Sequence, residues 1–157
     1  MLRVADYIAH FLQERGIEDI FMLTGYGSMY INDAIELSGI RHYAARNEAA
    51  APMMAEAYAR VKQSVGAVCV TAGPGATNAV PGLAEAWIDA APIIVLSGQV
   101  EKTHTTYQAN IPGLRTFGTA EINIIPIVEP LTKYAAFIDD PNSIRYHLEK
   151  AFYLATS

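Results

Sequence analysis

The sequence is short of cysteine and of charged residues. It holds one cysteine, Cys69, within the apolar run Ala67–Val70, so an intrachain disulfide is excluded and a buried, unreactive thiol is expected. Charged residues make up only 17% of the 157 residues, whereas hydrophobic residues make up 52%. This balance predicts broad internal burial or a large interface with a partner.

Basic runs and long apolar runs are also missing. Eleven Lys and Arg against sixteen Asp and Glu give a net charge of −5, which argues against a nucleic-acid partner. No apolar run reaches the length of a membrane-spanning helix, so no membrane partner is expected. Residues 1–16 carry charges throughout, unlike a signal peptide. We expect a cytoplasmic protein with one domain over residues 1–157.

Metal-ligand spacing and a hydrolase motif are not found either. The four histidines fall in different predicted elements: His10, His42, His104 and His147. Only His104 lies in a long polar loop, residues 100–118, that could carry it to a site. Ser28 and Ser97 have no nucleophile-elbow context. The sequence therefore predicts no metal site and no hydrolase triad.

What is present is an alternation of helical and strand patterns. Helices are predicted over residues 3–15, 29–37, 48–61, 121–128, from 141 to 153, and through 86–88. Strands are predicted over residues 17–23, 40–45, 65–71, 93–96 and 131–137. This order is typical of an α/β fold with a doubly wound, mostly parallel sheet and helices on both faces.

Several candidate residues directly follow predicted strands: Gly25, Glu48, the Gly73–Asn78 turn and Gln99. Ligands in such folds collect beyond the carboxyl ends of the strands, so we expect these residues along one rim. The turn lacks a nearby lysine and the phosphate-binding motifs, so a plain tight turn is an equal interpretation. Glu48 likewise has a structural interpretation, because acids suit the first turn of a helix, here with Asn47 as N-cap.

Three segments together resemble a known family: RNEAAAPMMAEAYAR at 46–60, VTAGPGATN at 70–78 and AWIDAAPIIVLSGQV at 86–100. They look like the N-terminal, pyrimidine-binding domain of thiamine-diphosphate enzymes of the acetolactate synthase group, which implies a thiamine-diphosphate-binding fold. The resemblance implies that Glu48 is the catalytic glutamate, which hydrogen-bonds the aminopyrimidine ring of the cofactor. Poor solvation among alanines favours the protonated carboxyl group that this proton exchange needs.

The resemblance also implies that Leu23, Gly25, Pro74 and Asn78 line the pyrimidine pocket.

The chain departs from the family at several positions. Asn47 replaces a histidine, Thr24 stands where proline is common, and Thr119–Glu121 stands where synthases carry Phe-Gln-Glu. The substrate is therefore left open between the 2-keto acid of a synthase and another 2-keto acid, diketone or acyl donor.

No Mg²⁺- and diphosphate-binding motif occurs in the chain, although the family carries one on a separate domain. The resemblance therefore implies a fragment of a longer enzyme that acts as a homodimer or homotetramer, with the diphosphate domain of a second subunit completing the site. A flavin is compatible with the family, but no residue here indicates one. Two alternatives stay open: a stand-alone alpha subunit of a split 2-keto acid decarboxylase, and a non-catalytic assembly module.

Overall fold

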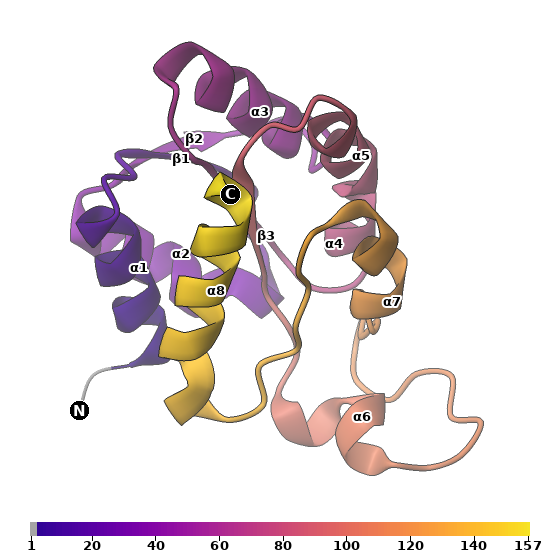
Figure 1. Cartoon of the computed structure of the whole chain (residues 1–157). Helices are drawn as coiled ribbons and strands as arrows, with labels where there is room; N and C mark the ends of the chain where they lie inside the picture. The colour runs from indigo at the N-terminus through magenta and orange to yellow at the C-terminus, as the bar shows by residue number, and fades with distance from the viewer. Residues whose placement is uncertain (1–2) are drawn as a thin grey trace.

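The computed structural model describes residues 3–157, which form one parallel sheet flanked by helices (Figure 1). The sheet order is β2-β1-β3-β4 and every pairing is parallel. Its strands are β1 (Asp19–Met22), β2 (Arg41–Ala44), β3 (Gly66–Val70) and β4 (Ile93–Ser97). The expected parallel α/β fold is confirmed.

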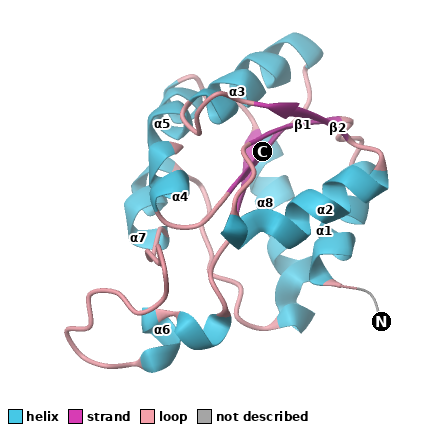
Figure 2. Ribbon diagram, turned by 180° about the vertical axis from the view of Figure 1, so that it is seen from behind, coloured by secondary structure: helices cyan, strands magenta, loops and turns pink. Residues whose placement is uncertain are grey.

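Eight α-helices precede, connect or follow the strands in the part of the chain that the structure describes. They are α1 (Val4–Glu14), α2 (Met29–Ser38), α3 (Ala50–Lys62), α4 (Pro74–Asn78), α5 (Val80–Ile88), α6 (Thr106–Ala109), α7 (Ile125–Val128) and α8 (Ile144–Thr156). Short 3₁₀ turns lie at η1 (Tyr26–Ser28), η2 (Lys102–His104), η3 (Glu129–Leu131) and η4 (Pro141–Ser143). Helices α1, α2 and α8 cover one face of the sheet, and α3 and α5 lie on the other (Figure 2).

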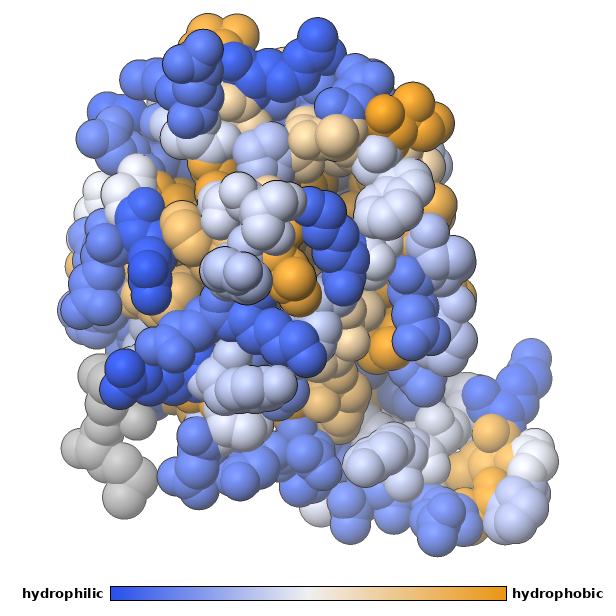
Figure 3. All heavy atoms as spheres, viewed as in Figure 1, coloured by the Kyte–Doolittle hydropathy of each residue, from blue (hydrophilic) through white to orange (hydrophobic). Residues whose placement is uncertain are grey.

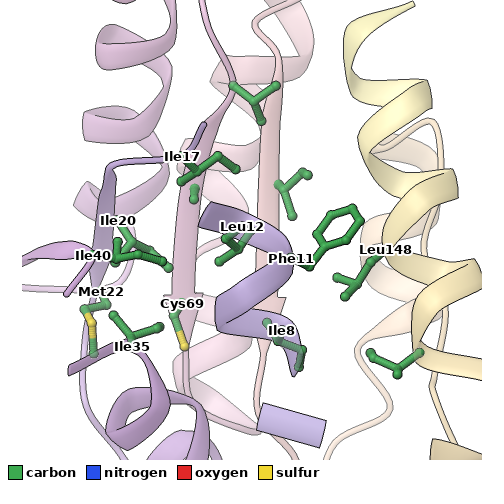
Figure 4. Packing of buried hydrophobic residues seen from close by; sticks show 14 residues of the cluster. Ile8, Phe11, Leu12, Ile17, Ile20, Met22, Ile35, Ile40, Cys69 and Leu148 are labelled. Atoms are coloured by element: carbon green, nitrogen blue, oxygen red, sulfur yellow. The ribbon is translucent and has the colours of Figure 1, made fainter. Parts of the chain in front are cut away.

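Two hydrophobic clusters, one on each face of the sheet, hold these layers together. Because side chains alternate along a strand, neighbouring positions of β1 belong to different clusters: Ile20 to the first and Phe21 to the second. In the first cluster, Phe11 and Leu12 of α1 lie between the strands and Leu148 of α8 (Figure 4). The second cluster is built on small side chains, above all the alanines of α3.

The predicted strand over residues 131–137 is wrong. Leu131 ends the 3₁₀ turn η3, and residues 132–137 pair with no strand of the sheet. A groove of about 640 Å³ separates this segment from β4, the last strand of the sheet. Apolar side chains of β4, α8 and the 131–138 segment line the groove.

The predictions for the preceding segments also need correction. The helix predicted over 121–128 spans only Ile125–Val128, because Pro126 is confined to the first turn of a helix. The predicted loop 100–118 contains η2 and the one-turn helix α6. It projects from the body of the domain in both ribbon views (Figures 1 and 2). Among residues 3–157, no helix has the length and apolarity required to cross a bilayer.

Candidate cofactor site

The candidate residues that follow β1, β3 and β4 lie on one edge of the sheet, as parallel strands require. Hydrogen bonds tie these turns together. The amide of Gly98 donates to the carbonyl of Val70 (2.9 Å), and the amide of Gln99 donates to the carbonyl of Gly27 (3.2 Å). The turns after β1, β3 and β4 therefore form one continuous rim.

Glu48 belongs to the same rim and its side chain points toward the glycine turn. It lies in the turn before α3 rather than inside the helix, and Asn47 Oδ1 accepts from the amide of Ala50 (3.0 Å) at the helix start. Glu48 Oε2 accepts from Asn78 Nδ2 at 2.6 Å. Glu48 Oε1 lies 3.3 Å from the position that a Cβ on Gly75 would take. The carboxylate is thus held beside residues that follow a different strand.

The solvation of Glu48 differs from the sequence-based expectation. Glu48 is half-buried and is not enclosed in a dry pocket. Among residues 3–157, Asn78 alone donates a hydrogen bond to the carboxylate, so Oε1 receives none. One oxygen is therefore fixed by an amide while the other stays available to a further donor.

Thr71, directly after β3, is a residue of the rim that the sequence analysis missed. Its Oγ1 accepts from the amide of Gly27 at 3.0 Å. The Thr71 side chain packs against both glycines. A Cβ on Gly25 would lie 2.5 Å from Thr71 Cβ, and a Cβ on Gly75 would lie 2.5 Å from Thr71 Cγ2. Both glycines are therefore needed for the turns after β1 and β3 to pack on Thr71. Its place just before the glycine turn was the only available signal.

The glycine turn itself is shaped by Gly73 and helix α4. Gly73 has φ +59°, a conformation that favours glycine, and a Cβ there would lie 1.8 Å from the carbonyl oxygen of Ala120. Pro74 is the first residue of α4 and Asn78 the last, so this short helix carries Asn78 to Glu48. Pro74 is itself exposed on the rim.

The remaining candidates are placed less directly. Leu23 is half-buried and its amide donates to the carbonyl of Cys69 (3.1 Å), so it anchors the first turn through its backbone. His104 lies on η2, with its ring edge-on to Phe117, and within residues 3–157 neither a hydrogen bond nor an ion pair joins it to Glu48. No group of three metal-binding side chains occurs in the described chain. Burial raises the pKa of the Cys69 thiol to about 12, which agrees with an unreactive cysteine.

Comparison with known families identifies the domain. Residues 2–117 match the model of the thiamine pyrophosphate enzyme, N-terminal TPP binding domain. The chain belongs to this family. The match covers more than half of the chain and includes β1 to β4, Glu48 and the glycine turn. The recognition of a thiamine-diphosphate enzyme domain from its motifs is thus confirmed.

Similar proteins carry the name acetolactate synthase. The chain is 37% identical over 154 residues to the acetolactate synthase large subunit of Haemophilus influenzae, covering 98% of this chain and 25% of that protein. It is 37% identical over 158 residues to the Escherichia coli isozyme 3 large subunit, covering 100% and 26%. For the Lactococcus lactis large subunit the identity is 39% over 145 residues, covering 92% and 24%. The chain spans about a quarter of the length of these relatives.

The rim fits the aminopyrimidine end of thiamine diphosphate on the chemistry of its groups. Such a ring presents N–H groups and ring nitrogens, and the free Oε1 of Glu48 can exchange a hydrogen-bonded proton with them. A Cβ at Gly75 would lie 3.3 Å from Oε1, so the glycine lets the carboxylate lie close to the turn. The rim therefore carries a carboxylate oxygen that receives no hydrogen bond from residues 3–157 and could meet such a ring.

Proposed function

We propose that the chain is the pyrimidine-binding domain of a thiamine-diphosphate-dependent enzyme that makes or breaks the bond beside a carbonyl group, with Glu48 as its catalytic residue. The observation that carries the proposal is the placement of Glu48: Asn78 holds Oε2, while Oε1 lies beside the glycine turn and receives no hydrogen bond from residues 3–157. Thiamine diphosphate, when bound, supplies the carbon nucleophile for the carbonyl substrate.

The chain's own residues orient the ring and control one proton. Glu48 holds a proton between Oε1 and the ring, and Asn78 keeps the carboxylate from rotating away from it. Gly25, Pro74 and Leu23 line the pyrimidine pocket, with Gly25 packed on Thr71 so that the backbone can approach closely. The half-buried state of Glu48 means that a second surface is needed to exclude water from its carboxylate.

That second surface is, in our proposal, the diphosphate-binding domain of another subunit. The chain would then be one domain of a longer, multidomain enzyme, and Mg²⁺ would be held with the diphosphate outside the residues described. A homodimer or homotetramer would supply the pairing. The relatives named acetolactate synthase support a 2-keto acid as substrate. A cytoplasmic location and the possible use of a flavin remain predictions.

Replacement of Glu48 tests the catalytic role. In the full-length protein that carries this chain, Glu48→Gln keeps an oxygen acceptor for Asn78 but loses the carboxylate proton exchange. We expect kcat with pyruvate or another 2-keto acid to fall by about 10²- to 10⁴-fold, the range typical of a lost general acid or base. Glu85→Gln, on the exposed face of α5, is the matched control and should retain wild-type kcat.

Two results would count against the proposal. Equal turnover by Glu48→Gln and the wild type would remove the assigned role of this residue. Titration calorimetry that detects no thiamine diphosphate binding to the full-length protein in the presence of Mg²⁺ would instead favour an assembly module without chemistry. Steady-state kinetics and calorimetry together therefore separate a misassigned residue from a misassigned function.

A further inference from the structure

The long loop after β4 returns to the rim along a segment, Gly118–Ile122, that is held at several points. A Cβ on Gly118 would lie 2.6 Å from the carbonyl oxygen of His104, so the backbones are in close contact there. The carbonyl of Ala120 occupies the space beside Gly73 in the glycine turn. The carbonyl of Ile122 accepts from Gln99 Nε2 at 3.3 Å. We call this segment the return limb.

The return limb carries a buried carboxylate, Glu121, which is 5% exposed. Its Oε1 accepts from Thr106 Oγ1 at 2.8 Å and from the amide of Thr106 at 3.2 Å. No Lys, Arg or His of the described chain forms an ion pair with it. Removing a carboxylate from water is unfavourable unless hydrogen bonds replace its hydration. The two bonds from Thr106 supply that replacement and join both limbs of the loop.

The preceding residue, Ala120, also has an unfavourable backbone conformation. Its φ of +58° is rarely adopted by a residue with a Cβ. A strained backbone and a buried carboxylate thus occur in adjacent residues, at the point where the return limb touches Gly73. Such features persist only where the surrounding contacts enforce them, and they concentrate at functional sites. Both features adjoin the contact between Ala120 and the glycine turn.

We propose that Glu121 is a positioning residue: through Thr106 it holds Thr119 and Ala120 in place as a wall of the site. Thr119, Tyr26 and His104 line a hollow of about 270 Å³ beside the first turn of the rim. Release of Glu121 would free Thr119 from this hollow and Ala120 from Gly73. The inference rests on the proposed function only in assigning the hollow to the carbonyl substrate.

We call the two hydrogen bonds from Thr106 to Glu121 the clasp. It is tested without cofactor or substrate, by hydrogen exchange on the full-length protein. Glu121→Ala removes the acceptor and Thr106→Val removes the hydroxyl donor, while Glu129→Gln changes an exposed carboxylate nearby. We expect the amides of Thr106 and of residues 118–121 to exchange about 10- to 100-fold faster in both clasp variants, as loss of a hydrogen bond to a charged group implies. Glu121→Gln, which keeps an oxygen acceptor, should restore most of the protection, and Glu129→Gln should match the wild type.

Kinetics then test whether the clasp positions a wall for the substrate. We expect Glu121→Ala and Thr106→Val to raise KM for the 2-keto acid about tenfold or more, with a smaller change in thiamine diphosphate affinity. Unchanged exchange in both variants would overturn the clasp, and so would faster exchange spread evenly over the domain. Faster local exchange with unchanged KM would overturn its link to the substrate. If even the wild type shows no thiamine diphosphate activity, the proposed function fails, while the exchange result still decides the clasp.

Discussion

At the scale of single residues, the rim is not the only place where hydrogen bonds hold a carboxylate. Asp19, the first residue of β1, lies at the opposite end of the strands and is 3% exposed. Arg41 donates to it from Nε (2.7 Å) and Nη2 (2.9 Å), and the hydroxyl of Tyr58 donates at 2.7 Å. The hydrogen bonds from Arg41, more than any other contact, lower the pKa of Asp19 to about 2. This group ties β1 to β2 and α3.

Replacement of Asp19 tests that stabilisation. A carboxyl whose pKa falls on folding stabilises the folded state above its ordinary pKa, and this contribution is lost as pH falls toward about 2. The shift of roughly two units corresponds to about 2.5 kcal/mol. We expect Asp19→Asn to lower the free energy of unfolding by about that amount at neutral pH, measured by urea denaturation. The difference from wild type should shrink between about pH 4 and pH 2.

An exposed carboxylate provides the control for this measurement. Asp33 pairs with Arg3 at 2.7 Å, but its side chain is 52% exposed. Asp33→Asn should therefore cost less than about 1 kcal/mol at any pH. A loss that is equal for Asp19→Asn and Asp33→Asn, or one that persists at pH 2, would contradict the assigned role of Asp19.

At the scale of elements, α3 packs closely on β3 and covers the second face of the sheet. Ala51, Ala55 and Ala59 of α3 are buried, and their small side chains let the helix backbone come near the strand. A Cβ on Gly66 would lie 2.2 Å from the carbonyl oxygen of Ala55. Since α3 follows the turn that holds Glu48, this contact also helps to place the catalytic candidate on the rim.

Substitution of Gly66 by alanine tests this close packing of α3 on β3. Gly66→Ala forces a backbone carbonyl to move, so we expect a loss of roughly 1–3 kcal/mol in the free energy of unfolding, the usual range for overpacking. Ser64→Ala, at an exposed position just before β3, is the control and should change stability by less than about 0.5 kcal/mol. Full tolerance of Gly66→Ala would show that α3 does not pack on β3 as described.

Most of the strands, but not all, could be predicted from local sequence. The strands β1, β3 and β4 were predictable because each is a short, largely apolar run after a helix. Strand β2 carries Arg41 and His42, and Gly39 marks the end of the helix before it. The segment 131–137 has a similar apolar pattern but forms no strand. Strand formation needs a neighbour with which to pair, and local sequence does not say whether one is present. The same applies to Glu121, whose burial depends on Thr106.

At the scale of the whole molecule, one edge of the sheet carries an exposed apolar surface. The groove between β4 and residues 132–138 is lined by apolar side chains, among them Ile93, Leu131 and Leu154. Figure 3 shows hydrophobic side chains at the surface between α8 and α7, on the same side. Apolar surface of this extent usually marks an interaction site. It accounts for part of the 52% hydrophobic composition.

Trp87, the only tryptophan, reports on this groove because it lines it and is 46% exposed. We expect the 157-residue chain to bind the apolar dye ANS in its folded state, with energy transfer from Trp87 to the dye. Trp87→Phe should abolish the transfer while retaining directly excited dye fluorescence. A folded chain that leaves ANS fluorescence unchanged would show that the groove is closed in solution.

The sequence by itself determined the class of fold, the family and the identity of the candidate acid, because apolar runs, helical periodicity and three ordered motifs are local properties of the chain. Only the tertiary structure decided which groups meet. Asn78 reaches Glu48 from 30 positions away, and Thr106 reaches Glu121 from 15, because strand order and helix packing bring those segments together. Hydrogen bonds of this kind depend on distances in space, and separation along the chain does not specify such distances.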